Sequence, residues 1–156
     1  MAEPKKKRNI LQKAFGGPET PDEILDHLRR EAPEFHAIVE AAMAVWDELR
    51  FGYTTKVYAQ ALSVELNYRG IAFEQNVPIT LQYRGETLDT GHTADFICQG
   101  DILLIVRSKI ALQPQDDAEL VSQLKSAEFQ KGLGFNFGPS KLSFKRVVAH
   151  PSARKR

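Results

Sequence analysis

The sequence predicts a single α/β domain with a mixed central β-sheet flanked by helices. Two observations carry this prediction. Apolar residues recur at three- and four-residue intervals early in the chain, as in amphipathic helices, but alternate with polar residues at 79–83, as in a half-buried strand. Residues 102–106 are apolar without alternation, which favours a central strand covered on both faces. A chain of 156 residues with 42% hydrophobic residues can form one core.

Three helices are expected in the first half of the chain. Thr20, Pro21 and Glu23 form a capping-box pattern, which predicts a short helix that begins there and ends before Pro33. A second helix should bury one apolar stripe, formed by Phe35, Ile38, Val39, Ala42, Val45, Trp46 and Leu49. A third helix is predicted from about residue 55 to residue 69, with Gly70 as its C-terminal stop.

The second half should supply the sheet and one more helix. Strands are predicted at 79–83, 92–98 and 102–106, and two closing strands at 132–137 and 143–148. A helix over 114–127 should point Leu120, Val121 and Leu124 inward, with Asp116 and Asp117 at its positive N-terminal end.

The two ends of the chain are expected to lie outside the domain, which we place at 20–149. Residues 1–19 should form a flexible basic arm and residues 150–156 a basic tail. The cationic side chains of these ends are Lys5, Lys6, Lys7, Arg8, Arg154, Lys155 and Arg156. The first run resembles a nuclear import signal, and it also suits a tail that binds phosphate backbones or an acidic partner, or that keeps the domain in solution.

Composition excludes several classes of protein. The net charge of +1 gives no general affinity for nucleic acid, and Cys98, the only cysteine, permits neither an intramolecular disulfide nor a cysteine-based zinc site. No apolar run is long enough to span a bilayer, and no apolar stretch follows the N-terminal charges as in a secretory signal. We therefore expect a protein of the cytoplasm that does not bind membranes.

Several segments resemble the GxxExxY family, a branch of the PD-(D/E)XK nuclease superfamily. Gly52-Tyr53-Thr54-Thr55-Lys56-Val57-Tyr58 resembles the signature of the family, and Leu88–Asp95 resembles its aspartate-bearing strand. The stretches 118–125 and 131–138 are similar to its last helix and strand. The resemblance covers about residues 35–148 and implies a restriction-endonuclease-like fold.

In that superfamily a divalent metal is held by an Asp on one strand and a Glu on the next, with a Lys two residues after the Glu. Carried over onto this chain, Asp95 keeps the aspartate and Lys109 keeps the lysine, and Gly52 and Tyr58 keep their signature places. The signature glutamate falls at Thr55, the strand glutamate at Arg107 and the helix glutamine at Glu119. A guanidinium stays charged and repels Mg²⁺, so we expect the catalytic site to be degenerate, with no metal cofactor.

Each of these residues also has a purely structural interpretation. Asp95 can cap a strand end or pair with Arg107, and Lys109 can be a solvated charge or a phosphate contact. Tyr58 and Cys98 are typical of a core, and a lone His92 is more often structural than a ligand. Asn136 and the adjacent Phe135 and Phe137 can line a nucleic-acid groove or pack the closing strand.

The sequence thus predicts a non-catalytic nuclease-like module that binds nucleic acid or a larger protein assembly. Candidate nucleic-acid contacts are Lys5, Lys6, Lys7, Arg8, Arg107 and Lys109. The alternative is an active Mg²⁺-dependent nuclease with a rearranged carboxylate set of Asp95, Glu119 and Glu65. The partner and the oligomeric state are left open.

Overall fold

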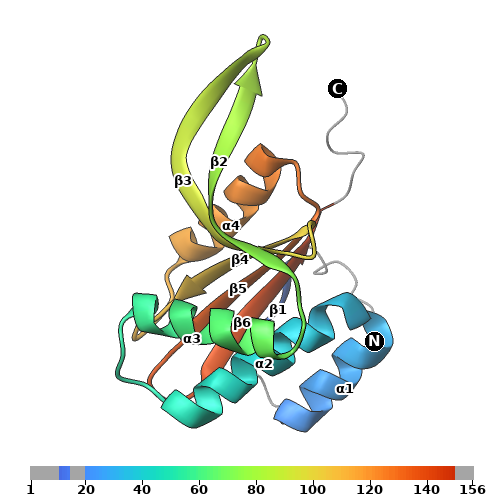
Figure 1. The fold of residues 1–156 in the computed structure, drawn as a ribbon, viewed down its shortest axis with the longest axis vertical. Helices are drawn as coiled ribbons and strands as arrows, with labels where there is room; N and C mark the ends of the chain where they lie inside the picture. The colour runs from blue at the N-terminus through green and yellow to red at the C-terminus, as the bar shows by residue number, and fades with distance from the viewer. Residues whose placement is uncertain (1–10, 15–19, 150–156) are drawn as a thin grey trace.

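The structure, a computed structural model, describes residues 11–14 and 20–149 and contains one six-stranded mixed sheet (Figure 1). The strand order is β1-β6-β5-β4-β3-β2; β4 and β5 run parallel, and all other neighbours run antiparallel. The strands are β1 (Leu11–Ala14), β2 (Phe73–Tyr83), β3 (Glu86–Cys98), β4 (Ile102–Arg107), β5 (Lys131–Phe137) and β6 (Leu142–Val148). The predicted α/β class with a mixed sheet is confirmed.

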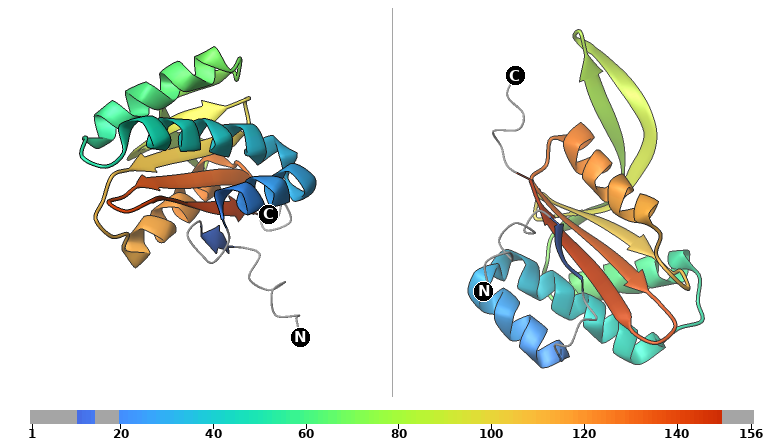
Figure 2. Two further views of the ribbon diagram at one scale, coloured as in Figure 1. Left: turned by 90° about the horizontal axis from the view of Figure 1, so that it is seen from below. Right: turned by 180° about the vertical axis from the view of Figure 1, so that it is seen from behind.

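Helices cover both faces of this sheet (Figure 2). One face carries α1 (Pro21–Glu31), α2 (Pro33–Leu49) and α3 (Thr55–Tyr68), and the other carries α4 (Pro114–Ala127). The helix starts follow the capping signals. Thr20 and Glu23 form the predicted capping box, and Asp116 forms another with the Gln113 backbone. No helix in the described part of the chain is long and apolar enough to cross a bilayer.

Two apolar clusters lie on the two faces of the sheet, and β4 contributes to both. Its residues Ile102, Leu104 and Val106 pack under α1–α3, whereas Leu103 and Ile105 pack under α4. This explains the apolar run without alternation, because successive side chains of a strand point to opposite faces. Burying one such side chain contributes about 1.5–3 kcal/mol of stability. The central position predicted for this strand is confirmed.

Helix α4 approaches the sheet closely at β5. A Cβ atom added to Gly132 would lie 3.0 Å from Leu124 Cδ1, and one added to Gly134 would lie 3.4 Å from Leu120 Cδ2. The inward directions predicted for Leu120 and Leu124 are therefore correct. The prediction for Val121 is wrong, since this residue is 40% exposed. Adjacent positions of a helix differ by about 100°, and α4 packs on the sheet along the narrower stripe of Leu120 and Leu124, which leaves Val121 at its margin.

The buried thiol of Cys98 is part of the cluster under α1–α3. Burial raises its pKa to about 12, so the thiol stays protonated at neutral pH. Its role as a small apolar residue agrees with the sequence-based interpretation.

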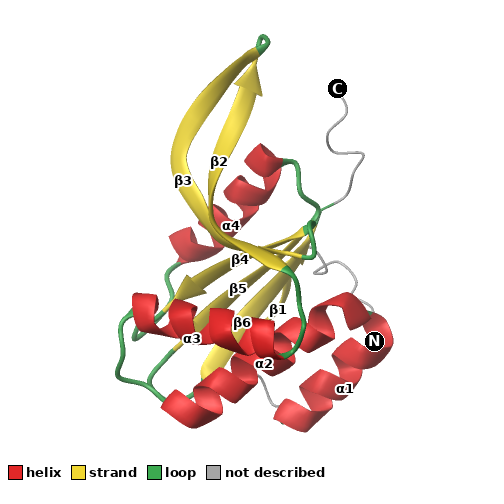
Figure 3. Ribbon diagram, in the orientation of Figure 1, coloured by secondary structure: helices red, strands yellow, loops and turns green. Residues whose placement is uncertain are grey.

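The hairpin of β2 and β3 is longer than predicted and projects beyond the body of the domain (Figure 3). Strand β2 begins at Phe73 rather than at residue 79, and β3 begins at Glu86 rather than at residue 92. An irregularity interrupts their pairing between Pro78 and Thr80, opposite Gly91, whose φ is 80°. Polar residues and a proline hide the strand pattern there because only Ile79 of β2 is buried.

The predicted boundary of the N-terminal arm needs a correction. Leu11–Ala14 form strand β1, which pairs with β6 with Leu11 opposite Val147. This segment therefore belongs to the sheet and not to a flexible arm. The basic run of Lys5, Lys6, Lys7 and Arg8 and the tail at 150–156 lie outside the described residues.

Candidate functional site at the end of strand β4

Charged side chains from three elements meet where β4 ends. Asp95 comes from β3, Arg107 is the last residue of β4, and Asp116 and Glu119 stand on the first turns of α4. Together with Lys109, which follows β4, they form what we call the Arg107 cluster. The connection from β4 to its parallel neighbour β5 runs through α4, and this places the start of α4 beside the end of β4.

The guanidinium of Arg107 lies among three carboxylates. Its Nη2 donates to Glu119 Oε1 at 2.6 Å, its Nη1 lies 3.7 Å from Asp95 Oδ2, and its Nε lies 3.8 Å from Asp116 Oδ1. The side chain is only 22% exposed. The predicted pairing of Arg107 with Asp95 is present. The shortest ion pair of Arg107 is made with Glu119, and the sequence did not indicate that these two residues pair.

Lys109 is engaged from two sides. Its Nζ donates to Asp116 Oδ1 at 2.7 Å, and Asn136 binds its backbone, accepting from the N–H at 2.8 Å and donating to the carbonyl at 3.1 Å. Lys109 is therefore an ion-paired residue at a fixed strand end and not a freely solvated charge. Asn136 and Asp116 are the two members of the site whose roles the sequence did not reveal.

The two aspartates of the cluster have opposite pKa shifts. Burial raises the pKa of Asp95 above its ordinary 3.8, and this effect outweighs the hydrogen bond from the Val106 N–H and the charge of Arg107. Burial also acts to raise the pKa of Asp116, but there the hydrogen bonds from Lys109 and the Gln113 N–H, with the charges of Lys109 and Arg107, lower it below 3.8. Of the two aspartates, Asp116 is therefore the one that the site favours in its charged form.

The aromatic residues beside the cluster belong to the core. Phe135 and Phe137 are buried, and Phe137 stacks on Tyr58 with ring centroids 4.6 Å apart. The buried Tyr58 donates its hydroxyl hydrogen bond to the Arg50 carbonyl and accepts one from the Tyr53 N–H at 3.4 Å. The packing interpretation of these residues is confirmed, and Asn136, which is 4% exposed, does not line an open groove.

The loop between α2 and α3, which contains Gly52 and Tyr53, is linked to the residue after β4 by a hydrogen bond. Ser108 donates its hydroxyl to the Tyr53 carbonyl at 3.0 Å. Gly52 has φ 133°, a backbone conformation that favours glycine. Thr55 stands exposed at the first turn of α3 and makes no side-chain contact with the Arg107 cluster. The start of α3 therefore carries an exposed, neutral hydroxyl at Thr55 rather than an acid.

Other predicted candidates lie at the margin of the site or away from it. His92 is half exposed, and its Nδ1 lies 4.0 Å from Glu119 Oε2. Glu65 of α3 pairs with Arg69 at the C-cap of that helix, with Arg69 Nε 2.7 Å from Glu65 Oε2, and takes part in none of the contacts of the cluster. Among the residues that the structure describes, no three His, Cys, Asp or Glu side chains are grouped so that they could hold one metal ion.

As arranged, these residues do not fit a magnesium ion. The chemistry of Mg²⁺ requires oxygen ligands at about 2.0–2.1 Å in octahedral geometry. The space among Asp95, Asp116 and Glu119 holds a guanidinium instead. Two cations face three carboxylates in the cluster, so one negative charge remains when all five groups are ionised.

The chain is an α/β domain with a mixed sheet, helices on both faces and three carboxylates gathered near the end of β4. A family model described as the PD-(D/E)XK nuclease superfamily matches residues 32–147, well over half of the chain. The chain therefore belongs to the PD-(D/E)XK nuclease superfamily.

The other comparisons add little. No curated protein matches the sequence. The crystal structure of SSO0001 is similar at 15% sequence identity and a TM-score of 0.47, over 83% of this chain and 65% of that chain. The chain thus spans less than two thirds of the length of that protein.

Proposed function

We propose that this chain is a catalytically inactive PD-(D/E)XK domain of the GxxExxY type, which acts as a binding module for a protein partner. The observation that carries the proposal is the placement of Arg107. Its guanidinium lies 2.6 Å from Glu119 and within 4 Å of Asp95 and Asp116, so a cation of the chain itself pairs with the acids on which a metal would depend.

The chemistry of the site supports inactivity. A guanidinium does not lose its proton in a protein, and it repels a doubly charged ion at this distance. To admit Mg²⁺, Arg107 would have to leave three carboxylates that are partly shielded from water, and such pairs are costly to break. Thr55, at the glutamate position of the signature, offers a neutral hydroxyl, a weak ligand for a hard cation.

A protein partner suits the described surface better than a nucleic acid. Arg107 and Lys109 are both engaged by carboxylates, and the excess negative charge of their cluster repels phosphates. Binding of nucleic acid would therefore depend on the basic ends of the chain, above all on residues 5–8. A reducing compartment such as the cytoplasm suits the free, buried Cys98.

One observation favours the alternative, an active Mg²⁺-dependent nuclease. Asp95 and Glu119 both contact Arg107, so a rotation of this side chain would leave two acids facing one space. Glu65, the third member of that set, is held by Arg69.

Cleavage assays test the proposal directly. Single-stranded DNA, double-stranded DNA and RNA are incubated with the full chain and Mg²⁺ or Mn²⁺, next to Asp95→Ala and Arg107→Glu. We expect no cleavage by the wild type, because Arg107 occupies the site. Cleavage that disappears in Asp95→Ala would overturn the proposed inactivity.

Metal binding gives a second readout that does not depend on the substrate. We expect MnCl₂ to leave the melting temperature of the wild type unchanged and to raise that of Arg107→Glu, which restores an acid at the strand position. Fluorescence anisotropy with the same nucleic acids, using the full chain and a chain without residues 1–10, tests the basic arm. Tight binding that survives this truncation would contradict a protein-only module.

A further inference from the structure

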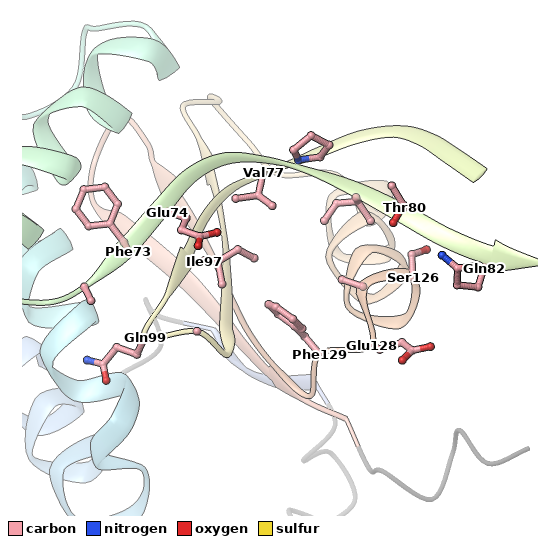
Figure 4. A pocket seen from close by; sticks show the side chains of 15 residues that line it. Phe73, Glu74, Val77, Thr80, Gln82, Ile97, Gln99, Ser126, Glu128 and Phe129 are labelled. Atoms are coloured by element: carbon pink, nitrogen blue, oxygen red, sulfur yellow. The ribbon is translucent and has the colours of Figure 1, made fainter. Parts of the chain in front are cut away.

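A surface pocket, separate from the Arg107 cluster, lies between β2 and the C-terminal end of α4 (Figure 4). Its volume is about 640 Å³, within the range of about 300–1,000 Å³ that is typical of binding sites. We call it the β2–α4 groove. It is lined from β2, from the end of β3 and the turn after it, and from the last residues of α4 and those that follow, and none of the members of the Arg107 cluster lines it.

The groove has an apolar floor between two acids. Val77, Ile97 and Phe129 converge on the space from three different segments (Figure 4). Glu74 and Glu128 flank this floor and are the only charged side chains among the 15 that line the groove. Neither carboxylate has an ion-pair partner among the residues that the structure describes. The groove therefore offers apolar surface together with two unneutralised negative charges.

The position of Glu128 at the end of a helix favours the binding of a cation beside it. This residue caps the C-terminus of α4 with φ 62° and ψ 34°, in the left-handed region. The C-terminal end of a helix carries a partial negative charge, so a carboxylate is unfavourable there and a cation is favourable. A lysine or arginine brought by a ligand would meet both the Glu128 carboxylate and the last carbonyls of α4.

One wall of the groove is an unpaired strand edge. Strand β2 is the last strand in the sheet order, and no described strand pairs with its outer edge. Only Ile79 among its residues is buried. Such an edge presents free backbone N–H and C=O groups that can pair with an added strand. Pro78 removes one donor, which limits the length of any segment that pairs there.

We infer that the β2–α4 groove binds an extended segment of a partner protein, in which apolar side chains are flanked on both sides by lysine or arginine. The apolar side chains cover Val77, Ile97 and Phe129, the flanking cations reach Glu74 and Glu128, and the backbone pairs with the edge of β2. This inference rests on the proposed function, because it names the surface and the partner chemistry of a protein-binding module.

The test uses the full chain and a peptide array. The nonapeptides have the pattern Ser-x-Thr-x-Thr-x-Thr-x-Ser, and their four x positions sample Val, Ile, Lys, Arg and Glu. Binding is measured by fluorescence anisotropy. We expect the tightest binders to carry cations at the outer x positions and apolar residues at the inner ones, with Glu at the outer positions weakening binding at least about tenfold.

Two matched double variants locate the site. Glu74→Lys with Glu128→Lys should weaken the best peptide by about tenfold or more, because it reverses both flanking charges. Asp47→Lys with Glu48→Lys makes the same change of net charge on exposed residues of α2, far from the groove, and should leave binding within about twofold. N-methylation of the peptide backbone at the central Thr should also abolish binding.

Several results would overturn the inference: no preference for cations at the outer positions, or equal losses in the two double variants. Tighter binding to a chain that ends at residue 149 would assign the groove to residues 150–156. A dimer in sedimentation that only the Glu74/Glu128 variant disrupts would assign it to a second copy of the chain. These outcomes can be told apart from a failure of the proposed function, because the proposed inactivity would be overturned by nucleic-acid cleavage that depends on Asp95.

Discussion

Two neighbouring regions near the end of β4 have different chemistry: one is an aromatic anchor in the core, and the other is a group of ion pairs. The first surrounds Tyr58, which is fully buried, stacks on Phe137 and donates to the Arg50 carbonyl. The second is the half-buried Arg107 cluster. The first region is held by aromatic stacking and a hydrogen bond to the backbone, whereas the second is held by ion pairs among partly exposed side chains. The two regions should therefore contribute to stability by different amounts and with different pH dependence.

The largest effect should come from removing the aromatic anchor. We expect Tyr58→Ala to reduce the free energy of unfolding by about 3–5 kcal/mol, because it leaves a cavity beside Phe137 and removes the tie to the Arg50 carbonyl. Urea denaturation measures this loss. Tyr58→Phe is the control: it keeps the ring and should cost only about 1 kcal/mol. A loss below about 1 kcal/mol for Tyr58→Ala would contradict the role of Tyr58 as an anchor.

A smaller effect is expected in the Arg107 cluster. Arg107→Met removes the cation that Asp95, Asp116 and Glu119 share and leaves Lys109 paired with Asp116 alone, so we expect a loss of about 1–3 kcal/mol at neutral pH. The loss should shrink in acid, where the carboxylates become protonated. Arg29→Met is the matched control, since its ion pair with Asp26 is 59% and 55% exposed and should contribute less than about 1 kcal/mol. Equal losses in the two variants would show that the Arg107 cluster contributes no more to stability than an exposed ion pair.

The smallest effect lies in the pH dependence of stability, where the two aspartates act in opposite directions. The pKa of Asp95 is raised in the folded state, so its stabilising contribution is complete below pH 3.8 and is lost as the pH rises through the raised value. The pKa of Asp116 is lowered, so its contribution is present above pH 3.8 and is lost as the pH falls through the lowered value.

Two substitutions separate these contributions. Relative to the wild type, Asp95→Asn should gain stability as the pH rises from about 3 to 7, and Asp116→Asn should lose stability over the same range. Urea denaturation at a series of pH values measures both slopes. Slopes of the same sign would contradict the opposite environments of the two carboxyl groups.

Much of the fold could be predicted because the sequence carries its local signals. The capping box at Thr20 and Glu23 and the stripe from Phe35 to Trp46 fix helices through contacts within one turn or one face. Strand β1 and the first half of β2 were missed. Their pairing is set by distant partners, and the polar segment Glu74–Asn76 has no alternation to reveal a strand at the sheet edge.

The site was predicted less completely than the fold. The family resemblance pointed to Asp95, Arg107, Lys109 and Glu119, and the structure brings these four together. It did not reveal Asp116 or Asn136, which bind Lys109 from α4 and β5. Such contacts depend on where α4 packs against the sheet, and this is set by the close approach of Leu124 to Gly132 rather than by the residues of the site.

Because Cys98 is buried, the reactivity of its thiol can report on local opening of the fold. The thiol lies on β3, is paired in register with Phe73 of β2 and with Ile102 of β4, and stays protonated and covered while these strands hold together. An alkylating reagent can reach it only when the helices that cover this cluster or the strands beside it move away. The rate of its modification therefore measures how often this side of the core opens, without any added label.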